Sequence, residues 1–149
     1  MSVEPQTDSE RVVVQFFATL SAGDLEGVRH LLHEEATWKP QMRAVPGAGI
    51  HRGRKGIVDD FLRPIRGMFR PGDPKIFVDA ITSRGPLVMM ESHSGGCFAD
   101  GRPYENLYAW AVEVRDGKIY ALREYFDSHY VMELMAGSGS AGPSTPVSK

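Results

Sequence analysis

The sequence predicts an α+β fold in which helices near the N-terminus are covered by a curved antiparallel sheet built from the second half of the chain. Apolar residues recur at helical spacing up to about residue 69, and from Lys75 onward they alternate as in strands. Gly-Pro and Asp-Gly pairs separate the strands, which is typical of hairpins. Helices followed by a run of strands indicate an α+β domain, and a strongly curved sheet around helices would leave an apolar cavity.

Two amphipathic helices are expected first. Thr7 and Glu10 have the spacing of a capping box, in which each side chain satisfies a backbone amide at the start of a helix. Gly23 is expected to end this helix, and Asp24 to cap a second one. Both helices carry apolar residues on one side, so each must cover an apolar surface.

The chain between these helices and the sheet is more varied. Residues 36–40 are a short strand candidate, and residues 45–56, rich in Gly and Pro, are expected to form a loop. A third helix is expected from about residue 55 to residue 69, kinked or split by Pro64. Four strands and a last helical turn then complete the domain: 75–83, 87–98, 104–114, 118–128 and 130–135.

The length of 149 residues suits one domain. We expect a flexible tail over residues 1–8, a single domain over residues 9–136, and a disordered tail over residues 137–149. A net charge of −2 gives no footprint for nucleic acid, and no apolar run reaches the ~18 residues of a membrane span. Neither partner is therefore expected. The N-terminus lacks the features of a signal peptide, so a cytoplasmic protein is expected.

The histidines and the cysteine of this sequence do not show the spacing of metal ligands. His30, His33, His51 and His129 do not share an element with acids at ligand spacing, so neither a metal site nor another cofactor is predicted. The single cysteine, Cys97, excludes an internal disulfide and a cysteine-based zinc site. His51 lies in the Gly-rich loop, for which a lid is one interpretation.

The residues that point to function lie in the last two strands. Residues 104–127 read YENLYAWAVEVRDGKIYALREYFD, with the hairpin signal Asp116-Gly117 at the centre. Glu124 belongs to an alternating set of otherwise mostly bulky side chains. An acid on the apolar face of a strand is costly unless it is paired or used, so Glu124 is the first candidate for chemistry.

Hairpin register decides which face Glu124 occupies, because a slip of one residue reverses the face. If the turn has two residues, Glu124 lies opposite Ala109. If it is a type I turn with a glycine bulge, Glu124 lies opposite Tyr108 and beside Trp110 and Leu122. The second register gathers the bulky side chains and is preferred. It points Glu124 into the cavity.

The order of elements, together with GRPYENLYAWAVEVRDGKIYALREYFD at residues 101–127, resembles the nuclear transport factor 2-like superfamily. Within it the chain is similar to the SnoaL-like polyketide cyclases and the limonene epoxide hydrolases, over roughly residues 9–135. The resemblance implies a conical α+β barrel with its active site inside, and a homodimer formed through the outer face of the sheet. It selects no single reaction, because this fold hosts isomerases, dehydratases, cyclases, hydrolases and binding proteins.

The limonene epoxide hydrolases use an Asp-Arg-Asp set that activates water and protonates the epoxide. The resemblance places one Asp at Glu124, the other at His93 and the Arg at Glu91. It places Trp38 and Pro40 where those enzymes have Tyr and Asn, so their water-binding set is largely absent. The SnoaL-like cyclases have a His at about the position of His93, which fits better.

We therefore expect His93 and Glu124 to transfer protons, with Glu91 setting the protonation state of His93, provided that all three converge on the cavity. Tyr108 and Asn106 are expected to hold the substrate oxygen. The full set of expected substrate-binding residues is Tyr108, Asn106, Trp38, Trp110 and Leu122.

The resulting hypothesis is a cofactor-free acid–base enzyme that cyclises or isomerises a small, apolar, oxygenated substrate of polyketide or terpenoid type. Epoxide opening by an internal hydroxyl is included. Epoxide hydrolysis and dehydration are alternative reactions. A binding protein of the same fold without chemistry is the alternative from another class, and outward-pointing Glu91, His93 and Glu124 would favour it.

Overall fold

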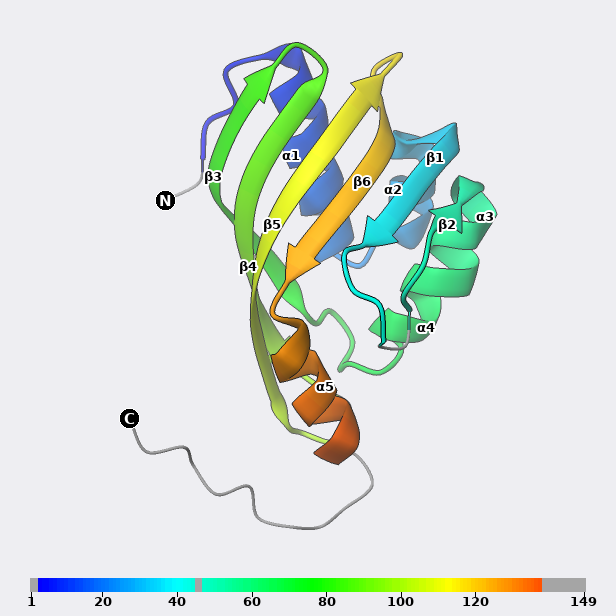
Figure 1. Cartoon of the computed structure of the whole chain (residues 1–149), viewed down its shortest axis with the longest axis vertical. Coiled ribbons are helices and arrows are strands. Elements are labelled where there is room, and N and C mark those ends of the chain that lie inside the picture. The colour runs from blue at the N-terminus through cyan, green and yellow to red at the C-terminus, as the bar shows by residue number, and fades with distance from the viewer. Residues whose placement is uncertain (1–2, 45–46, 138–149) are drawn as a thin grey trace.

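Six strands form one curved sheet: β1 (Leu32–Pro40), β2 (His51–Arg52), β3 (Lys75–Arg84), β4 (Leu87–Cys97), β5 (Pro103–Arg115) and β6 (Lys118–Phe126). The computed structural model describes residues 3–44 and 47–137. The strand order is β2-β1-β6-β5-β4-β3, and all neighbours are antiparallel except β1 and β6. Figure 1 shows the sheet curving around the N-terminal helices. The predicted α+β class is confirmed.

Two helices precede the sheet, α1 (Asp8–Ser21) and α2 (Leu25–Leu31). Their predicted caps are confirmed: Thr7 Oγ1 accepts the Glu10 N–H at 3.1 Å, and Asp24 Oδ1 accepts a backbone N–H in the first turn of α2 at 2.9 Å. The carboxylate of Glu10 also accepts a hydrogen bond from Ser83 of β3, so the start of α1 is tied to the sheet.

The third helical segment has three consecutive parts, α3 (Gly53–Ile57), the π-helical turn η1 (Val58–Leu62) and α4 (Arg63–Arg66). The Arg63 N–H bonds to the carbonyl of Val58, five residues earlier, as a π turn requires. Pro64 follows directly, so the interruption predicted there is confirmed and takes the form of a π turn. The segment ends at Arg66, earlier than predicted, and β2 occupies part of the expected loop.

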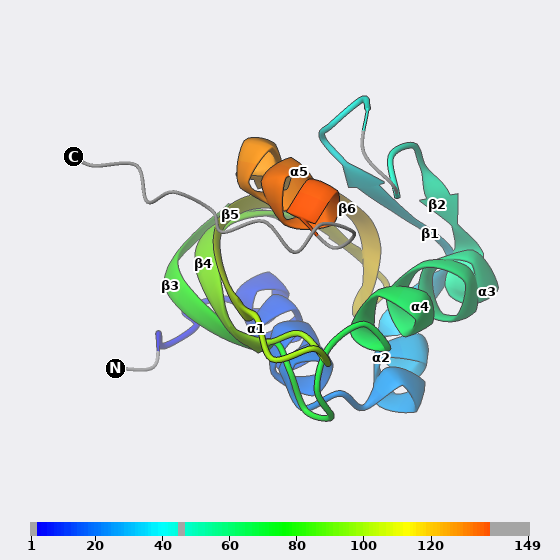
Figure 2. The ribbon, with the colours of Figure 1, turned by 90° about the horizontal axis from the view of Figure 1, so that it is seen from below.

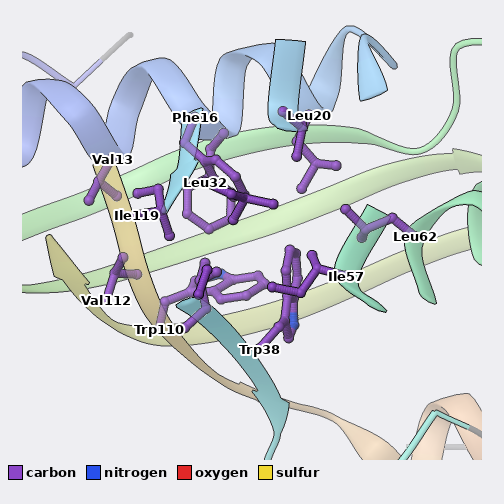
Figure 3. Packing of buried hydrophobic residues seen from close by; sticks show 14 of the residues in the cluster. Val13, Phe16, Leu20, Leu32, Trp38, Ile57, Leu62, Trp110, Val112 and Ile119 are labelled. Carbon is purple, nitrogen blue, oxygen red and sulfur yellow. The ribbon is translucent and has the colours of Figure 1, made fainter. Parts of the chain in front are cut away.

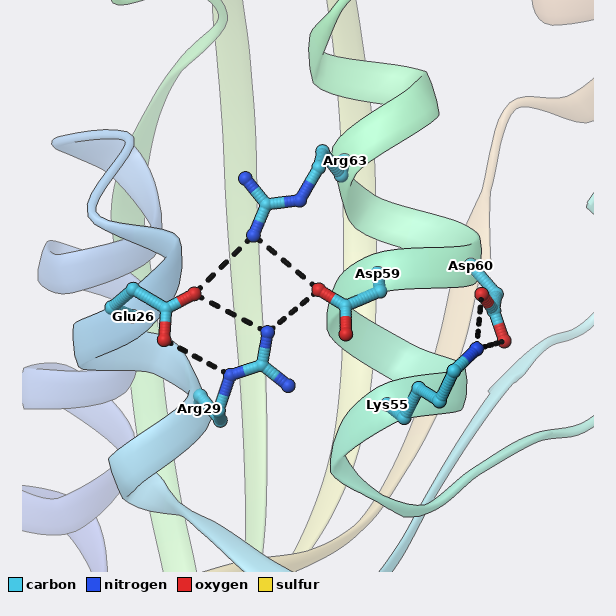
Figure 4. Close-up of polar contacts among 6 residues, drawn as sticks. All are labelled: Glu26, Arg29, Lys55, Asp59, Asp60 and Arg63. Atoms are coloured by element: carbon cyan, nitrogen blue, oxygen red, sulfur yellow. Dashed lines mark hydrogen bonds and ion pairs between the residues drawn. The ribbon is translucent and has the colours of Figure 1, made fainter.

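Ion pairs join α2 to this π turn (Figure 4). Arg29 Nη2 lies 2.6 Å from Asp59 Oδ1, and Arg63 Nη2 lies 3.3 Å from Glu26 and 3.4 Å from Asp59. Exposed pairs contribute little individually, but a network of them restrains both elements. The π turn carries Phe61, which lines the cavity described below.

The hydrophobic core lies between α1 and the sheet. Phe17 packs edge-on against Trp110 with ring centroids 4.7 Å apart, and Trp110 packs against Trp38 at 5.6 Å. The two tryptophans therefore connect α1 with strands β1 and β5 inside the core. Figure 3 shows the labelled members of this layer: Val13, Phe16, Leu20, Leu32, Trp38, Ile57, Leu62, Trp110, Val112 and Ile119.

The hairpin between β5 and β6 differs from both predicted registers. Asp116 and Gly117 have φ values of 54° and 70°, as a two-residue type I′ turn requires. Tyr120 is then skipped in the ladder, and this bulge places Glu124 opposite Trp110. The turn thus has the length of the first predicted register, and the bulge returns Glu124 to the inner face predicted by the second.

The chain leaves the sheet through α5 (Ser128–Gly137), where a strand end and a short helical turn were predicted. The tail expected over residues 137–149 lies outside the described residues except for residue 137. The division into a tail and a domain over residues 9–136 stays a prediction. No helix in residues 3–44 and 47–137 is long and apolar enough to span a membrane.

Candidate active site

A cavity of about 550 Å³ lies between the helical segment, the sheet and α5. Figure 2 views the molecule from the end at which α4 and α5 lie. This volume is within the range of small-molecule sites, which are mostly apolar with a few placed polar groups. Its apolar wall includes Phe61, Ile65, Phe69, Phe98, Phe126 and Leu134.

Two acids line this cavity: the exposed Asp60, which pairs with Lys55, and Glu124. Glu124 is half-buried and lines the cavity. Its Oε1 accepts a hydrogen bond of 3.0 Å from the indole Nε1 of Trp38. Burial raises the pKa of Glu124 from 4.5 to about 7, and the Trp38 hydrogen bond opposes part of this rise. Near neutral pH the carboxyl group therefore exists in both protonation states, as a proton-transfer group requires.

Two tyrosine hydroxyls line the same cavity. The hydroxyls of Tyr104 and Tyr108 are 2.5 Å apart, and Tyr104 also accepts a hydrogen bond of 3.1 Å from Asn106 Nδ2. Ser94 Oγ donates to Tyr108 at 3.4 Å. Burial raises the pKa of Tyr104 and Tyr108 above the usual value for tyrosine, and the charge of Glu124 adds to this. Both tyrosines therefore stay neutral donors at physiological pH.

One hydroxyl proton of this tyrosine pair is left over. The pair has two protons, and only one serves the mutual bond, whichever tyrosine donates it. Asn106 and Ser94 donate to the pair and accept nothing from it. Among the described residues no acceptor takes the second proton, so it is available to a substrate oxygen in the cavity.

Several predicted substrate-binding residues have other positions. Asn106 is 4% exposed and does not line the cavity, since its amide is used to hold Tyr104 and to accept the Leu107 N–H. Leu122 is 1% exposed and belongs to the core, not to the cavity wall. Neither residue is therefore among those that line the cavity, and their contact with substrate stays a prediction. Tyr108 lines the cavity as expected.

Trp38 and Trp110 are not among the residues that line the main cavity. Both border a smaller hollow next to it. Trp38 acts on the site through its hydrogen bond to Glu124, whereas Trp110 Nε1 donates to Ser92 Oγ at 2.9 Å.

The predicted convergence of three titratable groups is wrong. Glu91 is exposed, and His93 lies on the outer face of the sheet, with its Nδ1 2.8 Å from Asp79 and its ring stacked on Phe77 at 4.9 Å. The inner positions of β4 hold Val88, Met90, Ser92 and Ser94 instead, all at most 3% exposed. Serine can occupy an apolar face when its hydroxyl is hydrogen-bonded, and this pattern concealed the true inner face from sequence reasoning.

The site contains two groups that the sequence did not identify with it. Tyr104 alternates with Tyr108 and Trp110, and that spacing was the available signal. His51 lines the cavity, with its ring stacked on Phe61 at 3.8 Å and Nε2 2.7 Å from the carbonyl of Gly47. Its position at the cavity agrees with the lid interpretation of the loop, which stays a prediction. Within the described ranges, no cluster of three or more His, Cys, Asp or Glu side chains is placed to hold a metal ion.

Three of the solved structures that share this fold are described here. TerC co-crystallised with polyporic acid has a TM-score of 0.76 at 19% identity, over 87% of this chain and 99% of that chain. An NTF2-like protein of Burkholderia pseudomallei has a TM-score of 0.75 at 16% identity, over 87% and 98%. An LEH-like epoxide hydrolase of M. tuberculosis has a TM-score of 0.69 at 21% identity, over 90% and 94%. At these identities the likeness shows the fold alone.

No curated protein matches the chain. Residues 13–122 match the family model of the SnoaL-like domain, a span that contains Trp38, Tyr104 and Tyr108 and ends two residues before Glu124. The nuclear transport factor 2-like fold predicted from the sequence is confirmed, and the chain belongs to the SnoaL-like domain family.

Proposed function

We propose that this protein is a cofactor-free acid–base enzyme that isomerises or cyclises a small, mostly apolar, oxygenated substrate of polyketide or terpenoid type. One observation carries the proposal. Glu124, with a pKa of about 7, shares an apolar cavity with a tyrosine pair that has one hydroxyl proton to donate. A base and a hydrogen-bond donor on one apolar cavity are the two groups that proton transfer beside a carbonyl needs.

Glu124 and the tyrosine pair have different roles in the reaction. Ionised Glu124 takes a proton from a carbon next to the carbonyl, and the free tyrosine hydroxyl donates to the oxygen on which negative charge develops. Protonated Glu124 then returns the proton to another atom of the substrate. No atom is gained or lost, so the product is an isomer.

Opening of an epoxide by an internal hydroxyl follows the same scheme. Glu124 takes the proton of the hydroxyl, whose oxygen attacks one epoxide carbon. The bond from that carbon to the ring oxygen breaks, and the ring oxygen receives the proton from Glu124 while a tyrosine stabilises it. The product is a cyclic ether with a new hydroxyl and the mass of the substrate.

The cavity supports the substrate class. Its wall is mainly aromatic and aliphatic, with a few polar groups that include Tyr104, Tyr108 and Glu124, so it suits an apolar body with an oxygen function. The likeness to TerC co-crystallised with polyporic acid supports a small organic, oxygenated ligand.

Epoxide hydrolysis is the second candidate. A carboxyl group with a pKa of about 7 is equally suited to activate a water molecule, and the likeness to an LEH-like epoxide hydrolase favours this reaction. Dehydration uses the same acid–base pair and belongs to the same class. A protein that binds without chemistry is the remaining alternative.

The test is incubation of the wild-type protein with a panel of terpenoid and polyketide-type enones and epoxides in heavy-oxygen water, read by mass spectrometry. We expect consumption with unchanged product mass. Uptake of one labelled water would establish the hydrolase instead, and loss of one water the dehydratase. Absence of consumption across the panel would favour the binding protein.

The variant for this test is Glu124→Gln, which keeps the shape of the side chain and removes the base. We expect turnover to fall at least ~100-fold, as for loss of a general base. The matched control is Glu91→Gln on the outer face, which should leave turnover unchanged. Equal turnover of Glu124→Gln and wild type would refute the assignment.

We also propose that the protein is a cytoplasmic homodimer. The outer face of the sheet supports the dimer, because it exposes four large apolar side chains: Phe77, Met89, Leu107 and Tyr125. Exposed apolar groups that gather on one face are typical of protein interfaces.

A further inference from the structure

Asn106 lies between Tyr104 and Tyr108 on the inner face of β5 and is 4% exposed. A buried amide is costly unless both of its ends are hydrogen-bonded. Here both ends have a partner: Nδ2 donates to the Tyr104 hydroxyl at 3.1 Å, and Oδ1 accepts the Leu107 N–H at 2.8 Å. The side chain therefore connects the backbone of β5 to the tyrosine pair.

The bond to Leu107 fixes which end of the amide faces Tyr104. A backbone N–H can only donate, so it must meet the amide oxygen, and the amide nitrogen is left for the tyrosine. The opposite orientation would place an amide N–H against the Leu107 N–H and lose that bond. Asn106 is therefore a donor, and not an acceptor, toward Tyr104.

This donor decides how the pair can use its two hydroxyl protons. Tyr104 accepts from Asn106 and Tyr108 accepts from Ser94, so both tyrosines receive a hydrogen bond from the protein. One proton serves the bond between the two hydroxyls, and the other remains for a substrate oxygen. With an acceptor in place of the amide nitrogen, Tyr104 would donate to it and Tyr108 would donate to Tyr104. Both protons would then be used inside the protein.

The bond from Asn106 also makes Tyr104 a stronger donor. Burial raises the pKa of Tyr104, and the hydrogen bonds from Tyr108 and Asn106 oppose this rise. In a chain of hydrogen bonds each donor polarises the next, so a hydroxyl that accepts from an amide donates more strongly in turn. Such a donor stabilises the negative charge that develops on a substrate oxygen.

We propose that Asn106 is a positioning residue of the reaction, which directs the hydrogen bonds of the tyrosine pair so that one hydroxyl proton remains for the substrate oxygen. Asn106 is not among the residues that line the cavity, so it acts through Tyr104. This inference rests on the proposed function, since it concerns the donor used in turnover. It requires an amide, and not a carboxyl group, at this position.

Two substitutions separate this role from a purely structural one. Asn106→Asp keeps the shape of the side chain and the acceptor for Leu107, but it turns an acceptor toward Tyr104. Asn106→Leu removes both polar groups and leaves the second proton of the pair in place. Turnover is measured at pH 9, where the introduced carboxyl group is ionised because the Leu107 N–H and the Tyr104 hydroxyl donate to it.

We expect turnover to fall at least ~100-fold in Asn106→Asp and only about tenfold in Asn106→Leu. A residue that merely supports the strand would give the opposite order, because Asn106→Asp keeps more of the native shape and bonding. The matched control is Glu105→Gln, at the next position of β5 with an exposed side chain, and it should keep wild-type turnover. Circular dichroism confirms that each variant is folded.

The second measurement adds Asn106→Leu to each single tyrosine variant. In Tyr104→Phe the amide has no hydroxyl to act on, so the added substitution should leave kcat unchanged within about twofold. In Tyr108→Phe the donor is Tyr104, so the added substitution should lower kcat about tenfold. A structural role would lower kcat equally in both backgrounds.

A larger loss in Asn106→Leu than in Asn106→Asp overturns the inference, and so does an equal effect in the two tyrosine backgrounds. If Asn106→Asp does not fold, the comparison of the two backgrounds decides the question. Wild-type turnover that Glu124→Gln abolishes, together with either contrary result, refutes the role of Asn106 alone. Absence of wild-type turnover refutes the proposed function and this inference with it.

Discussion

Trp38 Nε1 lies 3.0 Å from Glu124 Oε1, and this hydrogen bond joins two residues that are 86 positions apart in the chain. The parallel pairing of β1 and β6 creates the contact, because it places Trp38 opposite Leu122 and Pro40 opposite Glu124. The indole is the only described partner of the carboxyl group and opposes the rise in its pKa caused by burial. The protonation of the candidate base is therefore modulated by a residue that is distant in the sequence and lies on the neighbouring strand.

Replacing Trp38 by Phe should raise the pKa of Glu124 above its value of about 7, because the hydrogen bond that favours the ionised form is lost. A carbon-13 NMR titration of the glutamate carboxyl groups measures this, with Glu124→Gln to assign the signal. Trp110→Phe is the matched control, since that indole donates to Ser92. A lower pKa in Trp38→Phe, or the same rise in Trp110→Phe, would contradict the assigned contact.

The stability of the protein should depend on pH through Glu124. Its pKa is 4.5 as an ordinary side chain and about 7 in the folded protein, so between these values the folded state binds more protons than the unfolded state. Stability from this group is then complete below about pH 4.5, falls as the pH rises, and is lost above about pH 7. The full effect is on the order of 3 kcal/mol, from a pKa difference of about 2.5.

Urea unfolding at pH 5 and pH 8 tests this dependence. Because Glu124→Gln lacks the titration, its free energy of unfolding relative to wild type should increase by on the order of 2 kcal/mol between the two pH values. Glu91→Gln on the outer face is the control and should keep a constant difference from wild type. The same constant difference in Glu124→Gln would exclude the raised pKa.

The tyrosine pair should tolerate the loss of one hydroxyl better than the loss of both. In either Tyr104→Phe or Tyr108→Phe the remaining tyrosine still has a proton for the substrate, so turnover should fall only about tenfold, mainly through lost positioning. The double variant should lose on the order of 100- to 1,000-fold. Tyr125→Phe on the outer face is the matched control. Wild-type turnover in the double variant would remove the pair from the mechanism.

The outer face of the sheet should form the interface of the proposed homodimer. Leu107 is 72% exposed there and pairs in register with His93, which stacks on Phe77. Burying an unpaired charge is costly, so Leu107→Glu should convert the dimer to a monomer in analytical ultracentrifugation. Ile50→Glu, at another exposed apolar position, should remain dimeric. A monomeric wild-type protein would exclude the dimer.

The inner face of β4 shows where sequence reasoning failed. The set with Glu91 and His93 contains the residues most often used in acid–base chemistry, yet it faces outward. The inner set includes Ser92 and Ser94, which look like surface residues until their bonds to Trp110 and Tyr108 are known. Alternation in this strand does not distinguish the two faces, because both sets mix apolar and polar residues.

Local and periodic patterns in the sequence were enough to predict several features of the protein. These include the α+β class, the cap at Thr7, the Asp116-Gly117 turn and the placing of Glu124 among bulky side chains. Each follows from backbone preferences or side-chain spacing over a few residues, and so can be seen without the rest of the chain.

The groups that surround Glu124 could not be predicted in this way, because they depend on how distant strands pair. The bulge at Tyr120 set the register, the parallel β1–β6 pair supplied Trp38, and the sheet brought the tyrosine hydroxyls to the same cavity. The physical reason is that the raised pKa of Glu124 comes from excluding water with side chains distant in sequence. No local pattern encodes that exclusion, so the chemistry of the site appears only when the chain has folded.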